Sequence, residues 1–321
     1  MSNQSPAAPL KSYGGQAVIE GVMMRGAHVA AISVRAPDGS IVTHEQPLNA
    51  ALYRGRISKT PFVRGMVGLW DALGLGTRAL LWSADVAIGT EEKFNFNGPL
   101  GWGTLAFSLL FGVGLFFVLP TAVASGIETL LSVEQSVLTN MIEGLVRLVL
   151  LLGYMWLIGR LPDVKRLFGY HGAEHKTINA YEAGVELTPE VVTQYPIEHP
   201  RCGTAFLLMV VLVSLIVYSL IGRPPFLWLI VSRVVLIPVI AGIAYEIIRF
   251  TAKHLDNPII RLIIKPNLML QHLTTREPDM QMLEVAISAF NRVLQAEQKA
   301  QYFNIVPEVV PAHPIMNLDE A

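Results

Sequence analysis

Four long apolar stretches dominate the hydrophobic pattern in the middle of this chain. Each holds about 20 mostly apolar residues, which is the length that an α-helix needs to cross a bilayer. Two of them carry no charge, while the other two tolerate charged positions. The pattern predicts a mainly α, polytopic membrane protein with four transmembrane helices, at residues 104–125, 137–159, 205–222 and 226–248.

The segment before these stretches, residues 60–89, has a different pattern. Its charged residues recur every seven positions, at Arg64, Asp71, Arg78 and Asp85, so they share one face of a helix. Such a helix is typical of the membrane surface. The alternative is a pair of ordinary amphipathic helices, broken at Gly74-Leu75-Gly76 and packed on a soluble part.

The N-terminal part alternates in the manner of β-strands. Residues 27–35 and 41–45 predict two strands, with Pro37-Asp38-Gly39 as the turn between them. The glycine-rich stretch at 13–26 predicts tight turns rather than a helix. This β-rich element is too short to bury a core of its own, so we expect it to lean on another part of the chain. Near the C-terminus, the apolar spacing predicts a helix over 280–299.

Composition supports membrane residence. Hydrophobic residues make up 52% of the chain, charged residues only 15%, and the mean hydropathy is +0.46, whereas soluble domains carry about 25% charged residues. The net charge of −1 gives no basis for a nucleic-acid partner. One cysteine, Cys202, excludes an intramolecular disulfide. The expected partner is the lipid bilayer.

Basic residues predict the orientation. They gather before the first span, in the connector at 160–204 and after the fourth span, while the first outer connector has none. Basic loops face the cytoplasm, so we expect a multi-pass protein of the bacterial inner membrane with both termini cytoplasmic. The expected parts are a disordered lead (1–12), a β-rich element (13–59), membrane-surface helices (60–103), the first two spans (104–159), a cytoplasmic connector (160–204), the last two spans (205–248), a cytoplasmic C-terminal region (249–305) and a loose tail (306–321).

The chemistry concentrates in the cytoplasmic connector. His171, Glu174 and His175 form an H-x-x-E-H pattern that puts all three side chains on one face of a helix. Two imidazoles one turn apart can hold a divalent metal, and the carboxylate between them can take a proton from water. The same pattern occurs in the inverted zinc peptidases. The alternative is an amphipathic surface helix that happens to carry these residues.

Three further residues are candidate metal ligands. His199 and Cys202 end the same connector, and Glu246 lies at the cytoplasmic end of the fourth span. The alternatives are a small buried Cys202, and a Glu246 that reaches water or pairs with Arg249. We expect the metal to be zinc, Glu174 to act as general base, and Lys176 or Arg25 to polarise a substrate oxygen.

Charged residues inside the spans predict a second cluster. Glu143, Arg147 and Arg233 would each cost several kcal/mol in lipid unless partnered, so they should face the helix bundle. Glu143 and Arg147 are one turn apart and can pair. The simple expectation is an ion cluster between the second and fourth spans. The sharper one is a polar pocket for a lipid phosphate or carboxylate that Arg233 would bind.

Four sequence blocks carry a resemblance to a known family, at residues 14–25, 171–182, 201–204 and 274–278. They resemble the YqhQ family of bacterial polytopic membrane proteins, and the resemblance runs from Tyr13 to about Arg292. It implies membrane residence, a predicted metal-dependent enzyme, and one working surface that joins Glu20, Met24 and Arg25 to the metal ligands. Two functions follow as hypotheses: a metal-dependent hydrolase acting on a lipid or membrane protein, and a non-catalytic scaffold with a structural metal. The oligomeric state stays open.

Overall fold

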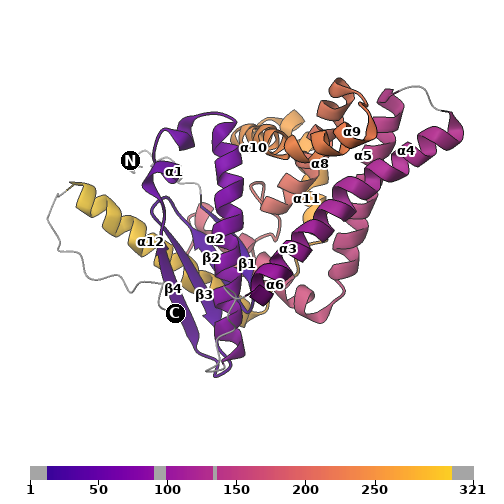
Figure 1. Cartoon of the computed structure of the whole chain (residues 1–321). Helices are drawn as coiled ribbons and strands as arrows, with labels where there is room; N and C mark the ends of the chain where they lie inside the picture. Colours follow the sequence, from indigo (N-terminus) through magenta and orange to yellow (C-terminus); the bar gives the residue numbers. More distant parts are fainter. Residues whose placement is uncertain (1–12, 90–98, 133–135, 306–321) are drawn as a thin grey trace.

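The computed structural model describes residues 13–89, 99–132 and 136–305 of the chain. The lead at 1–12 and the tail at 306–321, for which we predicted disorder and a loose end, lie outside the described residues. Within them the chain is mainly helical, with a small antiparallel sheet in its N-terminal part (Figure 1). The predicted combination of helices and a small β-rich element is therefore confirmed.

The sheet has four strands that neighbour one another in sequence order: β1 (Gly14–Val18), β2 (Gly21–Arg25), β3 (Val29–Arg35) and β4 (Ile41–Pro47). The last two are the predicted strands. The glycine-rich stretch forms a hairpin, β1–β2, rather than only turns. Its glycines permit close packing between strands, since a Cβ on Gly21 would lie 2.2 Å from the carbonyl oxygen of Ser33.

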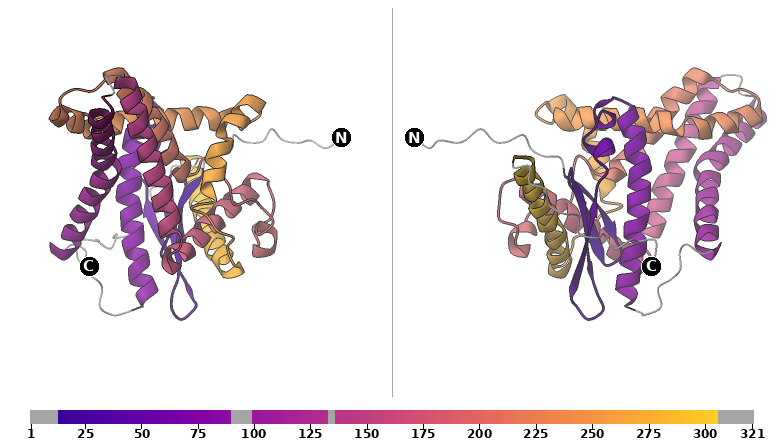
Figure 2. Two further views of the ribbon diagram at one scale, coloured as in Figure 1. Left: turned by 90° about the vertical axis from the view of Figure 1, so that its right-hand side faces the viewer. Right: turned by 60° about the vertical axis from the view of Figure 1, so that its left-hand side comes forward.

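Helices cover both faces of the sheet (Figure 2). Successive side chains of a strand point to opposite faces, and β2 shows the consequence. Met23 packs in one cluster with Leu75 of α2 (Val63–Ile88). Met24 packs in another, with Tyr170 of α6 (Pro162–Glu182) and Phe290 of α12 (Met280–Ile305). The β-rich element thus obtains its core from helices far away in the sequence.

The amphipathic segment at 60–89 lies on the sheet as one helix, α2, with no break at Gly74-Leu75-Gly76. Leu75 and Ala79 are buried against the strands. Gly76 faces the Gln16 side chain so closely that a Cβ would lie 2.4 Å from the amide oxygen. Residues 90–98 lie outside the described part of the chain.

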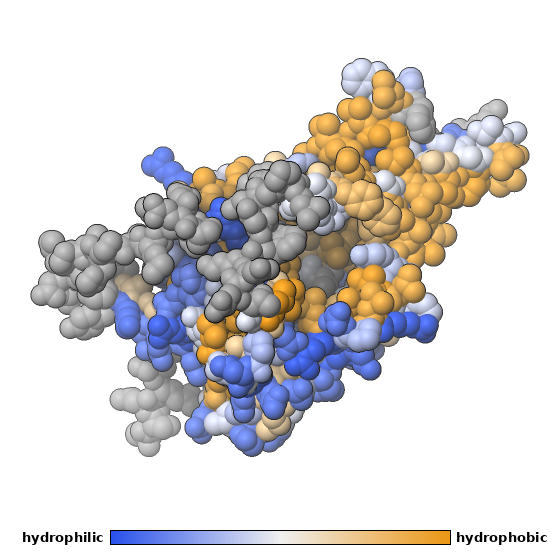
Figure 3. Space-filling model, turned by 60° about the horizontal axis from the view of Figure 1, so that its bottom comes forward, coloured by the Kyte–Doolittle hydropathy of each residue, from blue (hydrophilic) through white to orange (hydrophobic). Residues whose placement is uncertain are grey.

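Two helices among the described residues are long and apolar enough to cross a bilayer. The first, Ala106–Leu131, runs through α3 (Pro99–Val113), a π-helical turn η2 (Gly114–Val118) and α4 (Leu119–Leu131). The second, Val137–Ile158, lies within α5 (Ser136–Ile158). Figure 3 shows hydrophobic residues gathered over this end of the molecule and hydrophilic ones over the other. The apolar helices support membrane association.

The predicted third and fourth spans are shorter or broken. α8 (Gly203–Ile221) is ~28 Å long, slightly shorter than the ~30 Å hydrocarbon core, and its described apolar part is Phe206–Ile221. The fourth is two helices, α9 (Phe226–Val235) and α10 (Ile237–Lys253), bent by 42°. Pro238, which lacks an N–H, stands at this break. The expected four spans are therefore corrected to two, or three if the bent pair crosses as one.

Short helices complete the described chain. They are α1 (Ala50–Tyr53), η1 (Ile57–Lys59), α7 (Pro189–Val192) and α11 (Pro258–Gln271). α11 turns polar Asn267 and Gln271 inward and leaves Leu262 and Ile263 exposed. The predicted C-terminal helix at 280–299 is α12, and its buried Leu283 and Phe290 pack against the sheet.

Candidate metal centre

The structure brings His171 and His175 of α6 together with Cys202, which lies just before α8. One ligand atom from each residue lies within 4.8 Å of the other two. The Cys202 Sγ is 3.3 Å from the His171 Nε2, and the two imidazole rings are 4.4 Å apart between centroids. Histidine and cysteine are both usual zinc ligands. His171, His175 and Cys202 together form the His–Cys group.

Backbone carbonyls set the orientation of both imidazoles. The Nδ1 of His171 lies 2.8 Å from the carbonyl oxygen of Thr274, and that of His175 lies 2.5 Å from the carbonyl oxygen of Ile197. A carbonyl only accepts, so each Nδ1 carries a proton, and in the neutral ring the Nε2 keeps a lone pair. The Nε2 of His175 is buried and has no hydrogen-bond partner among the described residues. Metal-binding histidines are held in this way.

The loop that supplies the Thr274 carbonyl crosses α6 at Gly172. A Cβ on Gly172 would lie 2.1 Å from the carbonyl oxygen of Arg276, so only glycine admits the loop at this depth. The Arg276 N–H donates to the carbonyl oxygen of Phe168 at 2.9 Å, which ties the loop to the helix. The glycine of the H-G-A-E-H sequence therefore helps to place the His171 ring.

Lys176, which follows the two histidines on α6, holds the connector segment that supplies the Ile197 carbonyl. Lys176 is buried, and its Nζ donates to the carbonyl oxygens of Thr193 (2.9 Å) and Tyr195 (2.6 Å). It also lies 3.0 Å from the Glu277 carboxylate. These three partners occupy the three donors of an ammonium group. The structure thus gives Lys176 a structural position, and its expected role in polarising a substrate oxygen stays a prediction.

Glu174 is buried beside the His–Cys group, and burial raises the pKa of its carboxyl to about 7. The charge of His171, a hydrogen bond from the Gly15 N–H and the charge of Arg25 act in the opposite direction. Strand β1 runs directly against this side chain, since a Cβ on Gly15 would lie 2.8 Å from the Glu174 Oε1. A carboxyl with a pKa near 7 is suited to taking up and returning a proton.

Arg25 and Glu20, expected on the same surface, flank the centre in different ways. The Arg25 guanidinium lies over the Tyr53 ring, 5.5 Å from its centroid, and its charge acts on Glu174. Glu20 sits in the β1–β2 turn with φ of +50° and forms an ion pair with Arg166 of α6. Glu20 therefore fastens the hairpin to α6.

His199 lies next to the His–Cys group. Its ring centroid is 5.7 Å from that of His175, and its Nε2 is buried, 3.8 Å from the Glu182 carboxylate and without a hydrogen bond among the described residues. Burial lowers the pKa of His199, although Glu182 favours the charged form. The Gln271 side chain holds the backbone of His199 on both sides, at 2.8 and 2.9 Å.

Glu246 is not brought to the centre. It accepts hydrogen bonds from the Arg64 Nε at 2.8 Å and from the Phe62 N–H at 3.1 Å. The carboxylate therefore fastens the N-terminus of α2 to α10. The ion pair that we considered for Glu246 exists, but its partner is Arg64, far away in the sequence, rather than the neighbouring Arg249.

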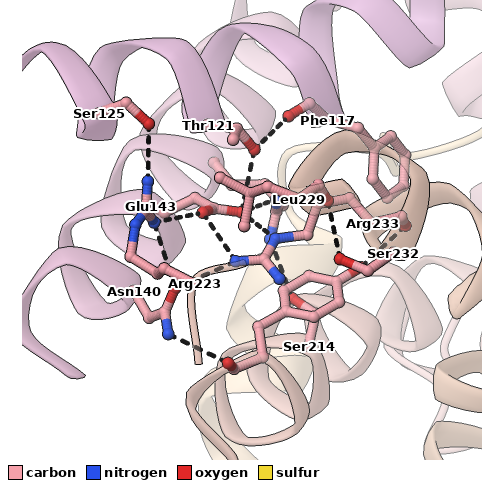
Figure 4. A network of polar contacts seen from close by, with 12 residues as sticks. Phe117, Thr121, Ser125, Asn140, Glu143, Ser214, Arg223, Leu229, Ser232 and Arg233 are labelled. Carbon is pink, nitrogen blue, oxygen red and sulfur yellow. Dashed lines mark hydrogen bonds and ion pairs between the residues drawn. The ribbon is translucent and has the colours of Figure 1, made fainter. Parts of the chain in front are cut away.

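The charged residues among the apolar helices α5 and α9 form a separate network (Figure 4). Glu143 accepts from Arg147 of its own helix at 2.9 Å and from Arg233 of α9 at 2.9 and 3.1 Å. Arg223, which lies in the short connector before α9, donates to Glu143 at 3.1 Å. Asn140 accepts from Arg223 and Arg233. The structure thus brings the three predicted residues together and adds a third arginine.

Almost every donor of this network is used. Arg147 donates to the Phe116 carbonyl, Ser214 and Glu143, at 2.9, 3.1 and 2.9 Å. The Nη1 of Arg233 has no hydrogen-bond partner in the described part of the chain, but the guanidinium lies 3.9 Å from the centroid of the Tyr218 ring, an attractive arrangement. Glu143 therefore supplies the anion that Arg233 needs, and the arrangement favours the ion cluster over a pocket for an external anion.

Comparisons with known proteins show the family of this chain. Residues 60–296 match the family described as "Protein of unknown function (DUF1385)". The chain is 38% identical over 300 residues to "Uncharacterized protein YqhQ" of Bacillus subtilis (strain 168), a match that covers 89% of this chain and 93% of that protein. No solved structure matches the chain. The chain belongs to the DUF1385 family, and the resemblance to YqhQ is confirmed.

Proposed function

We propose that this member of the DUF1385 family is a metal-dependent membrane enzyme, most simply a hydrolase, with a divalent metal held by His171, His175 and Cys202. The observation that carries the proposal is that one ligand atom from each of two imidazoles and one thiol lie within 4.8 Å of one another, while both Nδ1 atoms bond to carbonyls. Two nitrogens and one sulfur suit zinc, and three protein ligands leave a fourth position for substrate or water.

The roles of the nearby residues follow from their placement. A zinc ion, when bound, acts as a Lewis acid and lowers the pKa of water. Glu174 serves as the general base, because a carboxyl whose pKa is about 7 is partly ionised at neutral pH and can take a proton from water. Gly15 orients this carboxyl by its N–H, and Arg25 favours its charged form.

The position of the centre indicates the substrate class. α6 begins at Pro162, shortly after the candidate span in α5 ends at Ile158, and Cys202 directly precedes the apolar helix α8. A substrate held at this end of the bundle is more readily a lipid or a membrane-protein segment than a soluble metabolite. We place this end on the cytoplasmic face, with both termini inside, because the connector and the flanking segments carry the lysines and arginines, which the orientation rule counts. Reporter fusions to the two termini test this orientation, and an external signal from either one contradicts it.

A second function, a scaffold with a structural metal, is favoured by one observation. The His199 Nε2 is buried near His175 without a hydrogen bond to any described residue, so His199 could complete a closed shell of four protein ligands. In that case a His199→Ala variant should lose most of its metal. If three ligands suffice, as in the enzyme, the variant should keep it.

Metal content of the purified full-length protein tests the proposal directly. We expect about one zinc per chain, and its loss in His171→Ala, His175→Ala and Cys202→Ser variants. A His254→Ala variant is the matched control, because the His254 side chain is exposed, its one described hydrogen bond is to the Phe250 carbonyl, and its ring contacts only the Phe250 ring among the described ring contacts. Metal-free wild-type protein after purification with added zinc, or equal loss in the control, would contradict the proposal.

A further inference from the structure

A pocket of about 350 Å³ opens at the membrane end of α6, and none of its lining residues belongs to the His–Cys group. α6 contributes Pro162, Lys165, Arg166 and Gly169 to its wall. Gly169 and His171 stand ~200° apart around the helix, so the pocket and the candidate metal centre face different sides of α6. The two sites can therefore be tested independently.

Cationic side chains from two separate segments meet in this pocket. Lys165 and Arg166 come from α6, and Arg276 comes from the loop before α12. Arg166 is held by Glu20. Among the described residues, neither Lys165 nor Arg276 has a carboxylate partner. The Arg276 Nη1 donates to the carbonyl oxygens of His272 (2.6 Å) and Thr275 (2.7 Å), and the guanidinium lies 5.8 Å from the Phe168 ring centroid, while no described hydrogen bond uses its Nε or Nη2.

The two acidic residues of the pocket are already engaged. Glu277 lies 3.0 Å from the ammonium group of Lys176, which is buried behind the pocket. The Asp279 Oδ1 accepts the Met282 N–H at 2.8 Å at the start of α12. Lys165 and Arg276 are thus two cations that line one pocket and have no carboxylate partner among the described residues. A phosphate group matches them, because arginine binds phosphate oxygens with paired donors and lysine supplies a point charge.

The surroundings of the pocket lie at the level of lipid headgroups. The candidate span in α5 ends at Ile158, close before Pro162. Trp156 is exposed there, with the Arg160 guanidinium 3.5 Å from its ring centroid, and Trp and Arg are typical of the membrane–water interface. Leu161 is exposed as well. An anionic lipid is therefore the phosphate source nearest to the pocket.

From this arrangement we infer that the pocket between α6 and the 274–279 loop binds the phosphate headgroup of an anionic phospholipid, with Lys165 and Arg276 as its main contacts. Basic pockets between helices at this level are known to hold such headgroups. The bound lipid would join α6 to the loop whose Thr274 carbonyl orients His171. Binding of this lipid requires neither a metal nor catalysis.

Calorimetric titration of the full-length protein in a zwitterionic detergent tests the inference. The probe is dihexanoyl phosphatidylglycerol, and dihexanoyl phosphatidylcholine is the neutral comparison. We expect the anionic lipid to bind at least about tenfold more tightly, because both lipids carry a phosphate but only the choline lipid cancels its charge, so only the anionic lipid offers a net negative charge to the two basic residues. A Lys165→Gln/Arg276→Gln variant should reduce this preference to about the level of the neutral lipid. Lys165→Gln alone, which removes no described hydrogen bond, should lose part of it.

A Lys253→Gln/Lys265→Gln variant is the matched control, because it also removes two positive charges from exposed residues that lie outside the pocket. It should keep the wild-type preference. Equal loss in this control would mean diffuse attraction and would overturn the inference. So would a wild-type protein without lipid preference, or inorganic phosphate that displaces the lipid at equal concentration.

Discussion

The His–Cys group and the Glu143 network are both largely buried polar clusters, but they differ in how their polar atoms are arranged. In the Glu143 network, three arginines, Asn140 and neighbouring hydroxyls engage nearly every donor and acceptor. In the His–Cys group, the outer nitrogens of the two imidazoles are bonded, while the inner nitrogens and the thiol converge. Buried polar atoms are costly without partners. A saturated cluster therefore stabilises the fold, whereas a cluster with convergent lone pairs indicates a ligand.

The largest effect should come from breaking the saturated cluster. An Arg233→Leu variant removes a fully buried cation that donates to both Glu143 and Asn140. Loss of one partner from a buried ion pair costs ~3–5 kcal/mol. We expect a large loss of stability in detergent-based unfolding and poor accumulation in the membrane. Lys253→Leu, at an exposed position, is the control. Unchanged stability in Arg233→Leu would show that the network is not structural.

A smaller effect should follow from removing the Lys176 amine. Lys176→Met keeps the length of the side chain but leaves the Thr193 and Tyr195 carbonyls and Glu277 without their shared donor. Hydrogen bonds to charged groups contribute ~1.5–3 kcal/mol, so the free energy of unfolding should fall by about this amount. Zinc content at saturating metal should remain. If Lys176→Met kept full stability but lost all activity, Lys176 would have a catalytic role rather than a structural one.

The smallest loss of stability is expected from replacing a carboxylate of the sheet-packed helix α12 that accepts three hydrogen bonds. Glu297 of α12 accepts from the Ala27 and His28 N–H groups and from the His28 ring, at 2.8, 2.7 and 2.8 Å. Burial alone would raise its pKa, but the hydrogen bonds and charge of His28 outweigh burial and lower it. Glu297→Gln should cost ~1–2 kcal/mol at pH 7, measured by thermal unfolding.

The same carboxylate gives the direction of a pH dependence. Because the folded pKa of Glu297 is lower than the unfolded value of about 4.3, its contribution is fully present above that value and is lost as the pH falls through the folded pKa. Below about pH 4 the wild-type protein should therefore lose stability faster than Glu297→Gln. Glu284→Gln, on the same helix, removes only an exposed ion pair with Arg35, which contributes little, so it should behave nearly like the wild-type protein. Parallel acid profiles of all three proteins would contradict the assignment.

Local patterns in the sequence predict much of the fold and part of the candidate site. The H-x-x-E-H spacing places His171 and His175 on one helix face, and the membrane pattern places Cys202 near them. The period of the charged residues in α2 predicts a helix, but it does not decide between the membrane surface and the sheet. Leu75 and Met23, which decide it by packing together, lie far apart in the sequence.

The contacts that orient the site have no sequence signal of their own. The Thr274 and Ile197 carbonyls are backbone atoms, which every residue has, so the residue types do not predict these contacts. The one hint is Gly172, whose missing side chain admits the crossing loop. For Glu246 the residue type is misleading. A glutamate can bind a metal, but its carboxylate accepts a hydrogen bond from Arg64 of another helix. Long-range pairing of this kind appears only in the folded chain.

We propose that His171, His175 and Cys202 hold a metal. X-ray absorption spectroscopy at the zinc edge, on full-length protein loaded with one equivalent of zinc, shows which atoms bind it. We predict one sulfur ligand at ~2.3 Å and two imidazole nitrogens at ~2.0 Å, with the sulfur signal absent in Cys202→Ser. A shell of oxygen atoms without sulfur, unchanged by Cys202→Ser, would contradict the claim.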